Sequence, residues 1–197
     1  MSAECNVITR NITTKPLMCA NILLPIVRLL INDYETYGLL DDGSTNSLMS
    51  SSLCRRLGLE GMSAKVALTV VGSTTSRMTK LVEFDVKGYN ESMSYHMSSV
   101  IIVPEIPACN NATSAELAKY AHLEDIPAHG VESHRIEVLI GQDHSFLLIP
   151  DEVREGNPGE PHATHTRLGW AIQGPVSNVG APKMIHVNLV RSVPPVD

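Results

Sequence analysis

The chain has 197 residues, of which 43% are hydrophobic, and a formal net charge of −6 at pH 7. This apolar fraction suffices for a folded core and the length suits one domain with appendages, which excludes wholesale disorder. The acidic balance argues against a general nucleic-acid-binding protein, because no surplus of Lys and Arg exists to neutralise phosphates.

Membrane and secretory signals are weak. Residues 16–31 are apolar but are interrupted by Asn21, Pro25 and Arg28, a pattern unlike a membrane span. No charged-then-apolar signal segment precedes them. The four cysteines are widely spaced without a Cys-x-x-Cys pair, which is typical of reduced thiols in a cytoplasmic protein. We therefore expect a cytoplasmic protein without membrane contact.

The first part of the chain predicts a hairpin and a helix. Residues 1–15 are polar and expected to be flexible. Strand-prone residues 22–31 and 36–41 are separated by Asn32 and Asp33, which favour a turn. Residues 50–59 predict a short helix with serines at its start, arginines in its last turn and Gly58 as its stop signal.

The most informative stretch lies between that hairpin and the helix. An apolar run enters Asp41 and Asp42, and Gly43 follows, then Ser44, Thr45 and further small polar residues. This pattern predicts a buried strand that delivers a carboxylate to a tight turn, in which glycine permits the backbone geometry. The alternative interpretation is a plain polar turn between two strands.

A second hairpin is predicted from residues 65–71 and 78–86, and a further strand from residues 95–103. The polar residues expected at the hairpin tip are Gly72, Ser73, Thr74, Thr75 and Ser76. These residues alone are equally compatible with an ordinary surface hairpin.

The remaining chain predicts an insertion, a strand and an extension. Residues 104–135 are bracketed by prolines, with a possible short helix at 114–122, and form an insertion. An apolar strand then ends at Gly141, and a helix-prone run follows at 146–149. Residues 156–176 predict a C-terminal extension strand that brings Trp170 against the body, and residues 177–197 a loose tail.

Three motifs together resemble one family. The sequence Leu-Leu-Asp-x-Gly-Ser at residues 39–44 resembles the catalytic loop of retropepsin-type aspartic peptidases of the BEL/Pao retrotransposon group. The apolar strand ending at Gly141 resembles the element that supports this loop, and Gly-Trp-x-x-x-Gly-Pro at 169–175 resembles the ending that follows the peptidase unit. The resemblance implies an all-β fold over residues 16–155: a closed β-barrel with a flap hairpin and one or two short helices, giving half a site per chain.

The resemblance also implies a function. It makes Asp41 the catalytic carboxylate of an endopeptidase that cleaves extended peptides in a retroelement polyprotein, without a cofactor or metal. The loop would be supported by Asp42, Gly43, Ser44, Thr45 and Gly141, and residues 72–76 would form the flap. Because the Asp-x-Gly motif occurs once in the chain, a working site requires a homodimer with Asp41 from each subunit.

Two departures from the family pattern keep an alternative open. Asp42 stands where most such peptidases have Ser or Thr, and Gln142 stands where Arg is frequent. Both favour a catalytically impaired module that dimerises or binds peptides; a dormant, monomeric precursor segment is a third possibility. The eight histidines include His162-x-x-His165 but no complete ligand set, and no Gly-x-Ser-x-Gly motif is present, so neither a zinc site nor a serine hydrolase is predicted.

Overall fold

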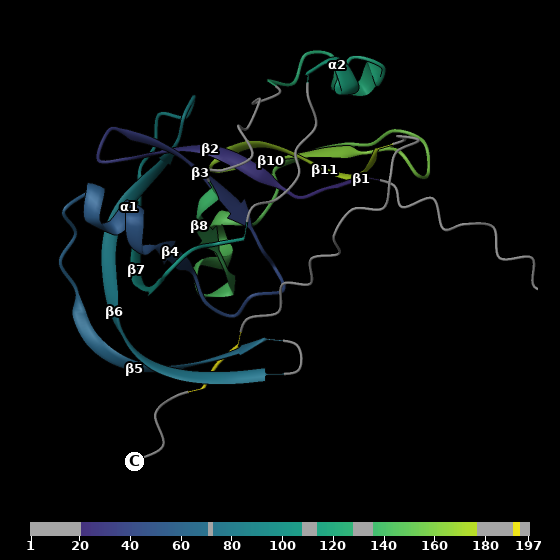
Figure 1. Cartoon of the computed structure of the whole chain (residues 1–197). Helices are drawn as coiled ribbons and strands as arrows, with labels where there is room; N and C mark the ends of the chain where they lie inside the picture. Colours follow the sequence, from purple (N-terminus) through teal and green to yellow (C-terminus); the bar gives the residue numbers. More distant parts are fainter. Residues whose placement is uncertain (1–20, 71–72, 108–113, 128–135, 177–190, 194–197) are drawn as a thin grey trace, which may run out of the picture.

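The computed structural model describes residues 21–70, 73–107, 114–127, 136–176 and 191–193. The fold is mostly β with short helices, as predicted (Figure 1). The strands are β1 (Asn21–Leu23), β2 (Ile26–Ile31), β3 (Tyr34–Leu40), β4 (Leu48–Ser50), β5 (Met62–Val70), β6 (Ser73–Gly88), β7 (Tyr95–Val103), β8 (Ile136–Ile140), β9 (Glu152–Arg154), β10 (His162–Thr166), β11 (Gly169–Val176) and β12 (Arg191–Val193). The helices are α1 (Ser51–Arg56) and α2 (Ser114–Leu117), with 3-10 turns η1 (Ala121–Leu123) and η2 (Gln142–Leu147).

Six strands close into a barrel. The pairings run β6–β2–β3–β8–β4–β7, and β7 pairs again with β6, so the ring has no open edge. Val27, Leu29, Met49, Val138 and other buried apolar side chains fill one large cluster between these strands. Closure satisfies backbone groups that an open sheet would leave unpaired.

The first hairpin forms as predicted, but its first strand is broken. Asn32 and Asp33 both adopt positive φ, at 48° and 60°, which is the geometry of the two-residue turn that matches strand twist. Pro25 lacks an N–H, and before it the chain leaves the barrel: β1 pairs with β11 in the other sheet. The interruption that Pro25 predicted within residues 22–31 is confirmed at Leu24–Pro25.

The second hairpin is longer than predicted. β5 and β6 pair from Met62↔Leu81 to Val70↔Ser73, so Ser73, Thr74, Thr75 and Ser76 lie in strand β6 instead of in a loop. Gly72 lies outside the described residues. In Figure 1 the hairpin curves below the barrel as two long ribbons. Its inner face packs on a second apolar cluster, to which it contributes Val66, Ala64 and Leu81.

Helix α1 follows its sequence signals closely. The Ser50 hydroxyl accepts a hydrogen bond from the Leu53 N–H at 3.1 Å, which caps the helix. Gly58 adopts φ +63° just beyond the last turn, where a side chain would be disfavoured. The helix predicted within the insertion is two separate short pieces, α2 and η1. The helix-prone run after Gly141 begins earlier than predicted, as η2.

The extension predicted as one strand is a hairpin of two. β10 and β11 pair from His162↔Gln173 to Thr166↔Gly169, with β9 and β1 on either side. Trp170 packs against a third apolar cluster that includes Tyr120 of the insertion. Residues 191–193, within the segment predicted to be loose, form strand β12 on the edge of β5.

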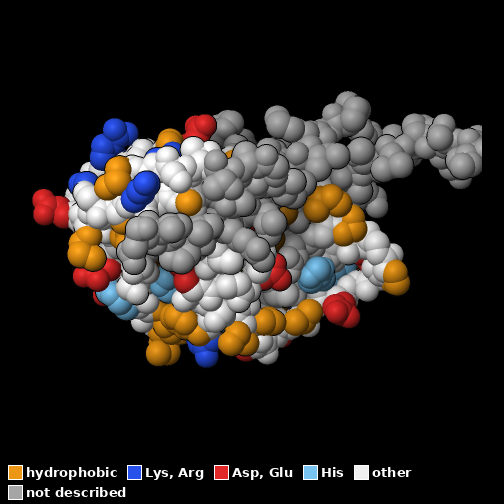
Figure 2. Space-filling model, turned by 90° about the horizontal axis from the view of Figure 1, so that it is seen from below, with side chains coloured by type: hydrophobic (Ala, Val, Ile, Leu, Met, Phe, Trp, Pro, Cys, Tyr) orange, Lys and Arg blue, Asp and Glu red, His pale blue; other side chains and the backbone are white. Residues whose placement is uncertain are grey.

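Some large apolar side chains lie outside these clusters. In Figure 2, orange side chains gather along one margin of the face shown. The exposed ones across the described surface are Ile22, Met62, Met78, Tyr89, Met93, Phe146, Ile149 and Val153. No helix among the described residues is long and apolar enough to cross a membrane.

Candidate active site

The candidate site forms where two parallel strands end. β3 and β8 run parallel, so Asp41, after β3, and Gly141, after β8, emerge at the same edge. β4 runs antiparallel to β8 on its other side. The chain between β3 and β4 must therefore cross over the end of β8, and this crossing is the loop that carries Asp41.

Asp41 is held by the backbone on both sides. Its N–H donates to the Ile140 carbonyl at 2.9 Å, and its carbonyl accepts from the Ser44 N–H at 3.3 Å. Its carboxylate Oδ1 accepts from the Gly43 N–H at 3.0 Å. The tight turn is where the sequence predicted it, and this side chain-to-backbone bond closes it. Gly43 does not adopt a positive φ, so the expectation that glycine is needed there for its conformational freedom is wrong.

Two oxygen atoms in this loop are buried without a partner. Among the described residues, Asp41 Oδ2 and Ser44 Oγ are the buried side-chain oxygens that make no hydrogen bond of normal geometry. Burial raises the pKa of Asp41; the Gly43 N–H opposes this rise, the charge of Asp42 adds to it, and the nearby Ser44 lowers it slightly. Asp41 thus holds its proton to a higher pH than a free aspartate, with one oxygen available to a new partner.

Gly141 allows the loop to lie directly on β8. A Cβ at this position would stand 2.7 Å from the carbonyl carbon and oxygen of Asn46 and 2.9 Å from the Ser44 carbonyl oxygen. The following residues continue the contact: the Gln142 N–H donates to the Ser44 carbonyl at 2.8 Å and the Asp143 N–H to Thr45 at 3.2 Å. The Gln142 side chain donates to the Asp42 carbonyl at 3.1 Å, so a neutral amide helps to hold the loop.

A buried polar cluster locks the far end of the loop. Asp143 accepts from the Ser47 N–H at 2.9 Å and from the Ser47 hydroxyl at 2.7 Å. The Ser47 hydroxyl also accepts from the Gly141 N–H at 3.0 Å. Burial acts to raise the pKa of Asp143, but hydrogen bonds from His144 and Ser47 outweigh it, and the pKa lies below its usual value.

A β-bulge supplies the last member of this cluster. The register between β6 and β7 shifts beside Glu83, and Ser99 adopts φ 58°, a strained conformation for a residue other than glycine. The bulge turns the Ser98 N–H toward His144, where it donates to Nε2 at 3.1 Å. Nε2 therefore carries no proton, and the ring proton lies on Nδ1, which faces Asp143 at 3.0 Å.

These residues do not form a serine-hydrolase triad. Ser47 and Asp143 both contact Nδ1 of His144, at 2.9 and 3.0 Å, whereas a triad uses opposite ring nitrogens. Nε2 is taken by a backbone N–H, and Ser47 is fully buried. The cluster is built to hold the loop.

Replacing Asp143 by Asn tests this role. We expect Asp143→Asn to lower the free energy of unfolding by about 2 kcal/mol at neutral pH, because bonds to a charged acceptor are lost. Since the folded pKa lies below the unfolded value of about 3.9, this contribution is complete above that value and disappears as the pH falls through the folded pKa. Urea unfolding at neutral pH and near pH 3 measures the size of the stability loss and its dependence on pH. An equal loss at the two pH values would contradict the role of the charge.

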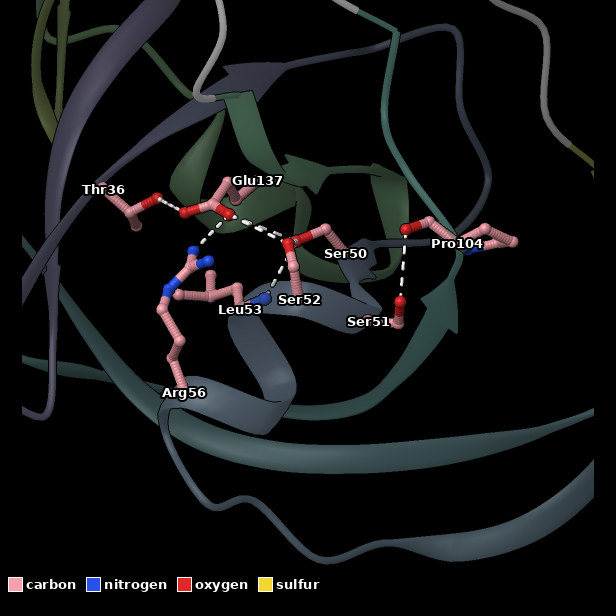
Figure 3. Close-up of polar contacts among 8 residues, drawn as sticks. All are labelled: Thr36, Ser50, Ser51, Ser52, Leu53, Arg56, Pro104 and Glu137. Atoms are coloured by element: carbon pink, nitrogen blue, oxygen red, sulfur yellow. Dashed lines mark hydrogen bonds and ion pairs between the residues drawn. The ribbon is translucent and has the colours of Figure 1, made fainter.

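A second buried acidic residue lies behind the site. Glu137, in the middle of β8, is 8% exposed. Figure 3 shows four side chains directed at its carboxylate: Thr36 from β3 donates at 3.1 Å, Ser52 at 3.2 Å and Ser50 at 3.5 Å, and Arg56 of α1 forms an ion pair with Oε1. The cluster joins α1 to both strands that deliver the site.

The sequence-predicted site residues divide into two groups. Asp41, Asp42, Gly43, Ser44, Thr45 and Gly141 lie together in the crossing, with the Asp42 and Thr45 side chains exposed. The predicted flap residues Ser73 to Ser76 lie on the β5–β6 hairpin, which shares an apolar cluster with Leu39, two residues before Asp41. Sequence reasoning missed Glu137, Ser47 and His144. A charged residue inside an apolar strand was the available signal for Glu137.

Several of the described histidines make hydrogen bonds to nearby protein groups. His165 contacts Asp151 at 2.7 Å and Glu91 at 3.5 Å, and His122 contacts the Pro161 carbonyl at 2.8 Å. Across the described ranges, no group of three or more His, Cys, Asp or Glu side chains is arranged to hold a metal ion. His129 and His134 lie outside those ranges.

Comparisons with known proteins give one distant structural similarity. No protein-family model and no curated protein matches the sequence. Among solved structures, a retropepsin-like aspartic protease from Rickettsia conorii is similar over 78% of this chain and 89% of its own, with 10% identity and a TM-score of 0.35. The closed barrel, the β5–β6 hairpin and the short helices match the retropepsin-like architecture that the sequence predicts.

Proposed function

We propose that this chain is an aspartic endopeptidase that works as a two-fold homodimer, with one Asp41 contributed by each subunit. The observation that carries the proposal is the buried Oδ2 of Asp41, which has no hydrogen-bond partner among the residues that the structure describes. A second carboxylate on the two-fold axis, with a shared proton and water, would satisfy this atom. Asp42 does not supply it, because its side chain is exposed.

The chemistry follows from two carboxylates that share one proton. The ionised member takes a proton from a water, and the protonated member donates to the carbonyl oxygen of the scissile peptide as the water attacks its carbon. The raised pKa of Asp41 favours the protonated member, and the Gly43 N–H steadies the ionised one. On the sequence resemblance alone, we further propose a retroelement polyprotein of the BEL/Pao type as the substrate and the cytoplasm as the location.

The test is cleavage of a mixed peptide library from about pH 3 to about pH 7.5, with sedimentation at each pH. We expect cleavage to follow the dimer fraction and to fall at least about a hundredfold in Asp41→Asn, because one group then loses both acid and base roles. Asp42→Asn is the matched control: it removes the neighbouring carboxylate and keeps the site. Cleavage that persists in Asp41→Asn would refute the proposal.

Asp42 favours a second candidate, a peptide-binding module without catalysis. An ionised Asp cannot donate a hydrogen bond to a partner loop, and two such carboxylates near a two-fold axis repel each other. A stable dimer that binds peptides but cuts none at any pH would establish this candidate. Recovery of cleavage in Asp42→Ser would then identify Asp42 as the cause.

A further inference from the structure

The outer edge of β5 carries a short strand from the far end of the chain. β12 pairs antiparallel with β5, with Arg191 opposite Thr69, Ser192 opposite Leu68 and Val193 opposite Ala67. β5 has β6 on its other side, so β12 occupies what would otherwise be the edge of the eight-stranded sheet (Figure 1). An unpaired edge of this kind is a template for any extended peptide.

The sequence limits this pairing to a few residues. Pro194 and Pro195 follow Val193 in the sequence, and proline has no N–H to donate to a ladder, so the sequence offers no backbone donor directly after Val193. β5 itself runs on to Met62, and its pairing with β6 covers its whole length, from Met62 to Val70. Beyond the three paired residues, the rest of the β5 edge has no strand partner among the described residues.

Such a contact is weak enough to be displaced. Each ladder hydrogen bond contributes a net of only about 1 kcal/mol, and a three-residue strand makes few of them. The contact persists because the segment belongs to the same chain, which gives it an effective concentration on the order of millimolar. A free peptide with a longer extended backbone would make more ladder hydrogen bonds along β5, and these offset the advantage of the tethered segment.

We infer that the β5 edge at Ala67–Thr69 is a strand-addition site for extended peptides and that residues 191–193 occupy it in cis. Recognition is through the backbone, so the partner class is an extended peptide without proline at the paired positions. The inference rests on the proposed function in one respect: it takes the extended peptide that binds this edge to be the substrate of the proposed peptidase. A substrate that binds along the β5–β6 hairpin would have to displace the chain's own end.

Hydrogen–deuterium exchange of the full chain tests whether the segment is seated. The variants are Ser192→Pro and Val193→Pro, each of which removes one N–H, and the matched controls Ser192→Ala and Val193→Ala keep it. Hydrogen-bonded residues alternate along an antiparallel pair, so at least one proline variant breaks the ladder. We expect exchange at residues 67–69 to rise at least about tenfold in that variant and to stay unchanged in both controls. Equal exchange at residues 67–69 in the unmodified chain and all four variants would overturn the inference.

Peptide binding tests whether the edge is a site. A fluorescent peptide with the sequence of residues 187–195 is titrated into the full chain carrying Asp41→Asn, which prevents cleavage. We expect it to bind at least about tenfold more tightly when Ser192→Pro or Val193→Pro is added, and to restore slow exchange at residues 67–69. Equal affinity with and without the proline, or no binding, would overturn the inference. This experiment measures binding and no cleavage, so its outcome can be interpreted even if the proposed catalysis is refuted.

Discussion

Gly141→Ala is expected to lower the free energy of unfolding by about 3 kcal/mol, at the upper end of the range for overpacking. Gly141 adopts φ −104° and ψ −171°, an extended conformation open to any residue, so alanine adds no backbone strain. The loss comes from contact alone: the new Cβ meets backbone atoms of Asn46 and Ser44 at 2.7 and 2.9 Å, and backbone cannot turn aside as a flexible side chain does. Urea unfolding measures the loss.

Gly58→Ala is the matched control for this prediction. A methyl group added at Gly58 would meet no atom within 4 Å, but the residue adopts φ +63°, so its replacement tests conformation without contact. We expect a smaller loss of about 1 kcal/mol there. Amide NMR shifts at residues 41–47 should move in Gly141→Ala and stay in place in Gly58→Ala. Unmoved loop shifts in Gly141→Ala would show that Gly141 does not set the position of the Asp41 loop.

Arg56→Ala is expected to cost about 3 kcal/mol of unfolding free energy. The Glu137 side chain is 11% exposed, and Arg56 is the cation paired with it. Among the described residues, its removal leaves the buried carboxylate with the hydroxyls of Thr36, Ser50 and Ser52 and without a cation. Arg55→Ala, on the same helix and exposed, should change stability by less than about 0.5 kcal/mol.

A double-mutant cycle separates the ion pair from packing. We expect Arg56→Ala combined with Glu137→Gln to be more stable than the sum of the two single losses predicts, because the double variant contains no unpaired buried charge. If the two single losses of stability simply add, the loss in Arg56→Ala comes from the packing of Arg56 over the Tyr34 ring and not from the ion pair. The centroid of this ring lies 5.3 Å from the guanidinium carbon. Loss of order in the Asp41 loop would further show that the cluster supports the site.

Elements governed by neighbouring residues were predictable. The turn at Asn32–Asp33, the Ser50 cap of α1 and the turn that Gly43 closes on Asp41 each depend on contacts within a few positions. The nearness of Gly141 to this turn was also predicted, but through a family resemblance; it joins residues far apart in the chain.

Other features follow only from the closed barrel. Closure brings Arg56 to Glu137 and the bulged Ser98 to His144, pairs separated by 81 and 46 positions. No local pattern marks such partners, because a buried charge is tolerated only once distant elements supply its hydrogen bonds. The same holds for β1, which Pro25 releases to the second sheet, and for β12, which pairs only because β5 offers an edge. By itself the sequence determined the apolar strand that leads into Asp41 and the turn that presents it. The tertiary structure decided which distant side chains hold that turn, because burial and long-range pairing exist only after the barrel has closed. It also left one oxygen of Asp41 without a hydrogen bond from any described residue.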